Sequence, residues 1–190
     1  MVTKSRKTAE TDITVSLRVD GSGRSNINSG VGFLDHMLTS LAKHSLMDLE
    51  VECKGDTHID DHHSVEDIGI VLGSLLHSEL YPLQGRERFG SASVVMDEAC
   101  VSTDLDLSNR PYLVYDVDVS GKVGSFDVEL AEEFFGSLVT KAGISAHIVM
   151  QRGKNKHHIV EATFKSFAVA LRRALAKNDR IGIPSTKDLL

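Results

Sequence analysis

His62-His63-Ser64-Val65-Glu66 recurs later in the chain as His157-His158-Ile159-Val160-Glu161. At 3.6 residues per turn, a helix places each glutamate between the two rings, about 40° from the first histidine and about 60° from the second. Neighbouring rings diverge by about 100°, so one imidazole can join the glutamate at one metal ion while the other reaches a second ion. The two copies predict a duplicated chain with two metal half-sites.

The pattern around each copy is duplicated as well. Apolar residues at period 2 predict strands, and apolar residues at period 3.6 predict helices. In the first half we expect strands over residues 12–19, 25–28 and 46–53 and helices over 33–44 and 62–81. In the second half we expect strands over 91–97, 101–107, 113–119 and 144–151 and helices over 128–141 and 157–177.

This order predicts an α+β fold of two pseudo-two-fold related ββαβα halves, about residues 10–90 and 91–177. Each half is expected to be a mixed sheet covered on one face by two helices. No linker rich in Pro, Gly or Ser separates the halves, so we expect one compact body over residues 1–190, with a C-terminal tail over 178–190.

Composition narrows the class of function. The formal net charge of −6 argues against an electrostatic nucleic-acid binder, and any anionic ligand must be held by a few placed cations. No apolar run approaches the roughly 20 residues that span a bilayer, and residues 1–11 lack the apolar centre of a signal peptide. Cys53 and Cys100 form no CxxC pair. We therefore expect a cytoplasmic protein without membrane or nucleic-acid partners.

The repeat also locates a third candidate ligand in each half. His36 precedes His62 by 26 residues, and Glu133 lies 24 residues before His157. Mixed imidazole and carboxylate donors suit divalent ions such as Mn, Fe, Zn or Ni, and spacing alone does not choose among them. Glu133 also fits a solvated helix face beside Glu132, so both interpretations of this residue stay open.

Together with further motifs, the paired histidines resemble the imidazoleglycerol-phosphate dehydratase family from about residue 10 to residue 187. The motifs are Gly32-Phe33-Leu34-Asp35-His36-Met37, His44, Asp60-Asp61-His62-His63 with Glu66-Asp67, Arg88-Phe89-Gly90, Asp106-Leu107-Ser108-Asn109-Arg110-Pro111-Tyr112, His157-His158 with Glu161-Ala162-Thr163-Phe164-Lys165, and Pro184-Ser185-Thr186-Lys187. The resemblance implies a lyase of histidine biosynthesis that dehydrates D-erythro-imidazole glycerol phosphate to imidazole acetol phosphate. It also implies self-association into trimers and a 24-subunit shell with active sites between subunits.

The resemblance further implies two Mn(II) ions per active site, with other divalent ions possible. Their ligands would be His36, His62, His63, Glu66, Glu133, His157, His158 and Glu161. Glu10 is given the acid/base role, with a metal-bound Glu66 or Glu161, or a metal-bound hydroxide, as its partner. The phosphorylated imidazole substrate would contact Glu10, His36, His44, His62, Glu66, Arg88, Arg110, His157, Lys165, Ser185, Thr186 and Lys187.

Lys165 has a geometric argument of its own, because it lies four residues after Glu161 on the same side of the predicted helix. The chain departs from the family at Glu133, where members often have histidine, and at Asp188, where many have glycine. Two other functions stay open: a di-metal phosphatase, and a non-catalytic metal-storage or metal-responsive assembly. The phosphatase would release inorganic phosphate, and a storage protein would have no use for the cations in the matched motifs.

Overall fold

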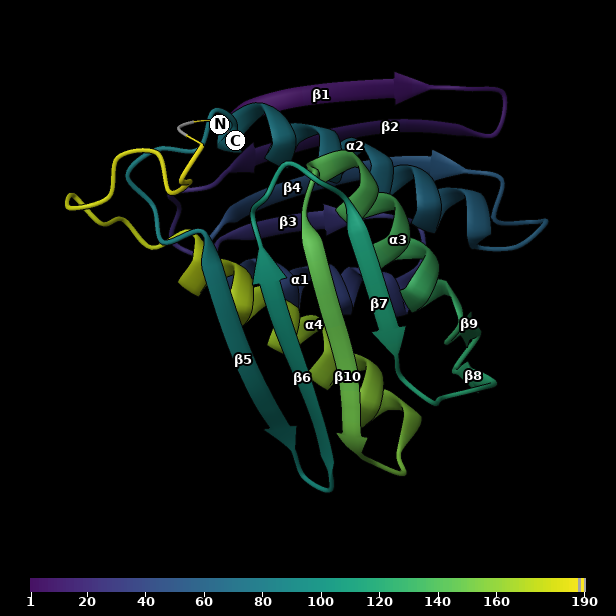
Figure 1. Ribbon diagram of the computed structural model, residues 1–190. Coiled ribbons are helices and arrows are strands. Elements are labelled where there is room, and N and C mark those ends of the chain that lie inside the picture. Colours follow the sequence, from purple (N-terminus) through teal and green to yellow (C-terminus); the bar gives the residue numbers. More distant parts are fainter. Residues whose placement is uncertain (188, 190) are drawn as a thin grey trace.

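Two four-stranded sheets share one strand order (Figure 1). The computed structural model describes residues 1–187 and 189. The first sheet has the order β1-β2-β4-β3, built from β1 (Val2–Lys7), β2 (Thr11–Arg18), β4 (Asp48–Gly55) and β3 (Ser25–Asn28). The second has the order β5-β6-β10-β7, built from β5 (Phe89–Met96), β6 (Ala99–Asp106), β10 (Ser145–Arg152) and β7 (Tyr112–Asp116).

Strand directions match as well. In the first sheet β4 pairs in parallel with β3, and in the second sheet β10 pairs in parallel with β7. The other two pairs of each sheet are antiparallel. The duplicated α+β fold with a mixed sheet in each half is therefore confirmed.

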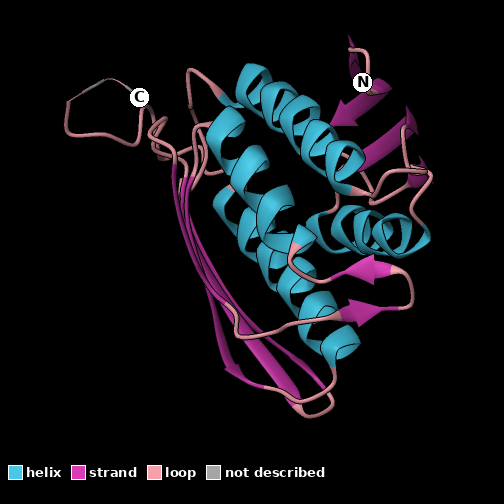
Figure 2. Cartoon of the chain, turned by 90° about the vertical axis from the view of Figure 1, so that its right-hand side faces the viewer, coloured by secondary structure: helices cyan, strands magenta, loops and turns pink. Residues whose placement is uncertain are grey.

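Four helices lie between the two sheets (Figure 2). They are α1 (Gly32–Ser45), α2 (His62–Leu80), α3 (Leu130–Ala142) and α4 (Lys156–Ala174). Helix α2 packs on β2, and α4 packs on β5 and β6. Across the halves, α1 packs on α4 and α2 packs on α3. Within the described residues, no helix is long and apolar enough to cross a membrane.

Close contact between α2 and α3 depends on two glycines one turn apart. A Cβ atom at Gly69 would lie 2.8 Å from the Phe134 carbonyl oxygen, and one at Gly73 would lie 2.4 Å from the Leu138 carbonyl oxygen. Such distances are shorter than van der Waals contact, so only glycine lets the backbones approach. Beside this contact, four buried phenylalanine rings form the centre of the core, namely Phe134, Phe135, Phe164 and Phe167.

Strand β1 has no counterpart among the predicted strands, so the first half is βββαβα. Its sequence is polar, and only Val2 and Arg6 are partly buried, because it is an edge strand that pairs with β2 alone. Such a strand carries little hydrophobic alternation and is missed by pattern. The short hairpin of β8 (Lys122–Val123) and β9 (Phe126–Asp127) was not expected either.

Several predicted boundaries were wrong by two or three residues, such as the end of β7, at Asp116 instead of residue 119. Two others have a clear cause in the backbone. Leu46 is not the start of a strand but the residue that ends α1, in the left-handed conformation at φ 63°, and β4 begins at Asp48. Helix α4 ends at Ala174 rather than Lys177, because Lys177 forms an antiparallel β-bridge with Arg86 instead. A backbone that pairs as a strand cannot continue the helical hydrogen bonds.

Candidate active site

Capping interactions place both histidine pairs in the first turn of a helix. The side-chain oxygen of Asn155 accepts hydrogen bonds from the backbone N–H groups of His157 (2.9 Å) and His158 (3.4 Å) at the start of α4. At the start of α2, Asp60 accepts from the backbone N–H of His62 at 2.9 Å. Asn and Asp favour such positions because they satisfy N–H groups that lack helical partners.

One group of three side chains converges in the geometry of a metal site. His36 Nε2 from α1 lies 3.3 Å from Glu161 Oε2 from α4, and His157 Nε2 lies 3.1 Å from the same oxygen. One ligand atom from each of the three lies within 4.8 Å of the others, and no second such group occurs among residues 1–187 and 189. The third ligand of the first half thus joins the histidine motif of the second half, because α1 packs on α4.

Lys165 completes the surroundings of this group, as its spacing predicts. Its Nζ lies 2.7 Å from Glu161 Oε1. Burial of Glu161 opposes ionisation, but the hydrogen bond and charge of Lys165, together with His36, outweigh it and lower the pKa of the carboxyl. His44 lies two turns beyond His36 on α1, and its pKa is lowered first by burial and then by the positive charge of Lys165.

The first motif is more open. Glu133 lies exposed on α3, ten residues before the left-handed residue Gly143 that ends the helix, and His36 lies ten residues before Leu46. Glu133 is therefore the structural equivalent of His36. His62 and Glu66 are half-buried on α2, and they form no convergent group with Glu133.

The second histidine of each pair turns away from the first. The ring centroids of His62 and His63 are 6.1 Å apart at 87°, and those of His157 and His158 are 6.2 Å apart at 82°. His63 Nε2 faces Glu10 Oε1 at 3.7 Å, so the predicted acid/base residue lies beside a predicted ligand. The rings of each pair therefore diverge as the helical geometry predicts, and the binding of two ions by each pair stays a prediction.

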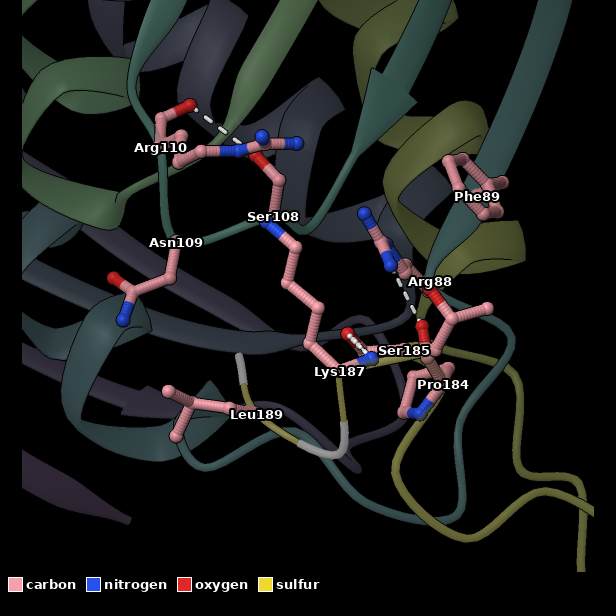
Figure 3. A pocket seen from close by; sticks show the side chains of 10 residues that line it. Arg88, Phe89, Ser108, Asn109, Arg110, Pro184, Ser185, Lys187 and Leu189 are labelled. Atoms are coloured by element: carbon pink, nitrogen blue, oxygen red, sulfur yellow. Dashed lines mark hydrogen bonds between the residues drawn. The ribbon is translucent and has the colours of Figure 1, made fainter.

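Five of the residues that the resemblance places in contact with the substrate line a cleft of about 690 Å³ between the β6–β7 loop and the C-terminal segment (Figure 3). Its lining includes Arg88, Arg110, Ser185, Thr186 and Lys187. In Figure 3 the Lys187 side chain extends toward the Ser108–Arg110 loop. Three cationic side chains around one cleft make it suited to an anion. Lys165 does not line this cleft, because it is paired with Glu161.

Arg88 is held more firmly than the other cations. Its guanidinium donates to both oxygens of Asp106, at 2.7 and 3.1 Å, and to the Pro184 carbonyl oxygen at 2.6 Å. The hydrogen bond to Asp106 raises the pKa of Arg88. Arg110 is three-quarters exposed and lies 4.0 Å from Asp106. Arg88 thus fixes the C-terminal segment to the sheet, while Arg110 and Lys187 are free to contact a ligand.

The convergent group and the cleft lie at opposite ends of α4. His157 is in its first turn, whereas the backbone N–H of Arg88 donates to the carbonyl oxygen of Ala174, its last residue. At 1.5 Å per residue these ends are about 25 Å apart. The length of strand β5 leads to a similar separation. Its eight residues extend over about 26 Å, and they connect Arg88 at the cleft to the turn at Asp97 beside His158.

Three carboxylates that contact candidate site residues were given no role from the sequence. Asp56 bonds His63, Glu98 bonds His158, and Asp106 holds Arg88. Each lies in a turn or at a strand end, where a carboxylate is common and carries no pattern of its own. A search for carboxylates in the turns of each half, once the duplication was known, is the signal that could have found Asp56 and Glu98.

The fold and these side chains define a class of protein: a duplicated α+β chain with paired His-His-x-x-Glu helices and a cationic cleft. A family model described as imidazoleglycerol-phosphate dehydratase matches residues 29–171. The chain is 72% identical to imidazoleglycerol-phosphate dehydratase from Sulfurimonas denitrificans, over the full length of both. The crystal structure of the dehydratase from Staphylococcus aureus aligns with a TM-score of 0.83 and 41% identity, covering 94% of this chain and 100% of that one.

The structure of the dehydratase from Pyrococcus furiosus, in complex with (S)-C348, aligns with a TM-score of 0.85 and 38% identity, covering 98% of this chain and 100% of that one. The chain belongs to the imidazoleglycerol-phosphate dehydratase family. It is accordingly an enzyme of the hydro-lyase class.

Proposed function

We propose that this enzyme dehydrates D-erythro-imidazole glycerol phosphate to imidazole acetol phosphate. We propose that each active site uses two divalent metal ions, of which Mn(II) is the ion we expect. The observation that carries the proposal is the convergence of His36, His157 and Glu161 on one point. Two imidazole nitrogens and a carboxylate held ionised by Lys165 are a donor set that Mn(II) accepts, so the residues fit the ion. When bound, the ions would stabilise negative charge that develops on the imidazole of the substrate.

The chain's own residues supply the rest of the chemistry. Elimination removes hydroxide from the carbon attached to the imidazole and a proton from the neighbouring carbon, and the two leave as water. The enol that remains becomes the keto product when the carbon beside the ring takes up a proton. We assign these proton transfers to Glu10, whose side chain is half exposed and lies beside His63. Arg110, Lys187 and Ser185 would hold the phosphate through charge-assisted hydrogen bonds.

The active site must then be shared between copies of the chain. An imidazole ring, three carbons and a phosphate extend to about 10 Å, from ordinary bond lengths. One such molecule cannot join His157 to a cleft about 25 Å away along α4. A neighbouring copy that brings its cleft to this metal group solves the problem, so the distance supports self-association of the chain. We propose that this self-association takes the form of trimers and a 24-subunit shell, and that the enzyme acts in the cytoplasm.

One experiment tests the reaction and separates it from the rival functions. Metal analysis of the purified protein is combined with an assay for the keto product, with Mn present and after chelation. We expect product only with metal and no release of inorganic phosphate. Phosphate release would favour a di-metal phosphatase, and bound metal without turnover would favour a storage assembly.

A further inference from the structure

The second histidine of each pair, His63 or His158, is hydrogen-bonded to a carboxylate through its Nδ1 atom. His63 Nδ1 lies 3.0 and 3.2 Å from the two oxygens of Asp56. An ionised carboxylate only accepts hydrogen bonds, so Nδ1 is the nitrogen that carries the hydrogen. The other nitrogen, Nε2, is left with its lone pair toward Glu10.

The second half repeats this arrangement with different residues. His158 Nδ1 lies 2.8 Å from Glu98 Oε2, and its Nε2 lies 3.8 Å from Asp97 Oδ2. Asp56 follows β4, whereas Glu98 lies in the turn between β5 and β6. The duplicated chain therefore reaches the same ring geometry from carboxylates at two unrelated positions, which is not expected of incidental surface contacts.

Both carboxylates are themselves fixed by the backbone. The Asp56 N–H donates to the Glu10 carbonyl oxygen at 3.1 Å, and its side chain is only 14% exposed. Glu98 Oε1 accepts from the N–H groups of Asn155 at 2.6 Å and Lys154 at 3.1 Å. These bonds hold one oxygen of Glu98 on the backbone and leave the other oxygen, Oε2, facing His158.

We infer that Asp56 and Glu98 are a matched pair of positioning residues, which hold His63 and His158 in the tautomer whose Nε2 can bind a metal ion. The inference rests on the proposed metal function and extends it to residues that contact neither ion nor substrate. A carboxylate behind a ligating imidazole fixes its orientation and raises its basicity, and its loss typically costs about 10–100-fold in metal affinity.

Two measurements test the inference, using Asp56→Ala, Glu98→Ala and the milder Glu98→Gln. The control is Glu52→Ala, which removes an exposed carboxylate that accepts from Asn28 and contacts neither histidine. The first measurement reads the imidazole ¹⁵N shifts of metal-free protein at alkaline pH. We expect Nδ1–H for His63 and His158 in the parent, and loss of that preference only at the ring whose carboxylate is removed.

The second measurement is the affinity for Mn(II), from the free-ion EPR signal. We expect each alanine variant to bind about 10–100-fold more weakly at one class of site, Glu98→Gln to lose less, and Glu52→Ala to match the parent. Nε2–H tautomers in the parent, or parental Mn affinity in both alanine variants, would overturn the inference. A parent that binds no Mn would instead refute the proposed metal function, while the tautomers still decide the positioning.

Discussion

The two helix pairs of this molecule share a backbone and a histidine geometry but differ in charge. In the α1/α4 pair, His36 and His157 meet Glu161, and Lys165 balances the carboxylate. In the α2/α3 pair, Glu133 replaces the first histidine, and Ile70 stands where α4 has Lys165. The α2/α3 pair thus carries two carboxylates, Glu66 and Glu133, and lacks the lysine that α4 has at the matching position.

This difference explains why one group converges and the other stays open. Glu161 can approach two imidazoles because Lys165 supports its charge in a buried position. Glu66 and Glu133 carry like charges, and α2 has Ile70 at the position of Lys165, so no lysine at that position supports a second buried carboxylate. The two halves therefore share the backbone and the paired histidines. They differ at the third candidate ligand, His36 or Glu133, and at the position that holds Lys165 in α4 and Ile70 in α2. The α2/α3 pair should depend on a bound cation more strongly than the α1/α4 pair.

The largest expected effect comes from Glu10, the proposed acid/base residue, which lies in the first half. Glu10→Gln keeps the shape of the side chain but cannot transfer the proton, so kcat should fall by about 10²–10⁴-fold with substrate binding retained. Steady-state kinetics measure this, with Glu52→Gln as the control. Turnover at the parental rate would remove Glu10 from the chemistry.

Substitutions in the cleft should change substrate binding. The cleft belongs to the second half alone: Arg88 precedes β5, whereas the equivalent position before β1 is occupied by Met1. Arg110→Ala or Lys187→Ala removes a charge-assisted contact to a phosphate that is the same in ground and transition states. We expect KM to rise by about 10–100-fold with kcat little changed. Arg88→Ala should also lower the melting temperature, since Arg88 ties the C-terminal segment to Asp106. A loss confined to kcat would contradict this assignment.

Glu133 tests the divergence between the helix pairs directly. Glu133→Gln should weaken Mn binding at one of two sites by about 10-fold, because a charged ligand oxygen becomes neutral. Glu133→His, which restores the residue type of α1, should be tolerated. Glu132→Gln is the matched control on the neighbouring exposed position. Isothermal titration gives both values, and equal affinity in all variants would show that Glu133 is only a solvated surface residue.

The smallest effect is on the pH dependence of stability in the metal-free protein. The hydrogen bond of Glu98 raises the pKa of His158, with further contributions from the charges of Asp97 and Glu161. A raised pKa in the folded state stabilises the fold below the unfolded value, about 6.5, and this gain is lost as pH rises through the folded value. The stability advantage of the parent over Glu98→Gln should therefore be largest below about pH 6.5 and shrink as the pH rises above it. Urea denaturation measures this, and a constant difference would contradict it.

The sequence pattern predicted the duplication and both histidine helices, because each has a local signature, whereas the residues of the cleft were implied only by the family resemblance. Helical spacing places Lys165 on Glu161. The edge strand β1 lacks a hydrophobic pattern, and the carboxylates Asp56 and Glu98 lie in turns. His36 meets His157 and Glu161 because α1 packs on α4. These helices are distant in the chain, and spacing alone does not encode their packing. The tail prediction at Asp188 lies outside the described residues.

The central claim is that one active site takes its metal group and its phosphate cleft from different copies of the chain. Co-expression of Glu161→Gln with an Arg110→Ala, Lys187→Ala double variant tests it most directly. Each variant alone should have little activity at low substrate concentration. Mixed oligomers purified through two different tags should regain activity, because some sites combine an intact metal group with an intact cleft. Mixed oligomers no more active than the separate variants would contradict the claim and return the whole site to a single chain.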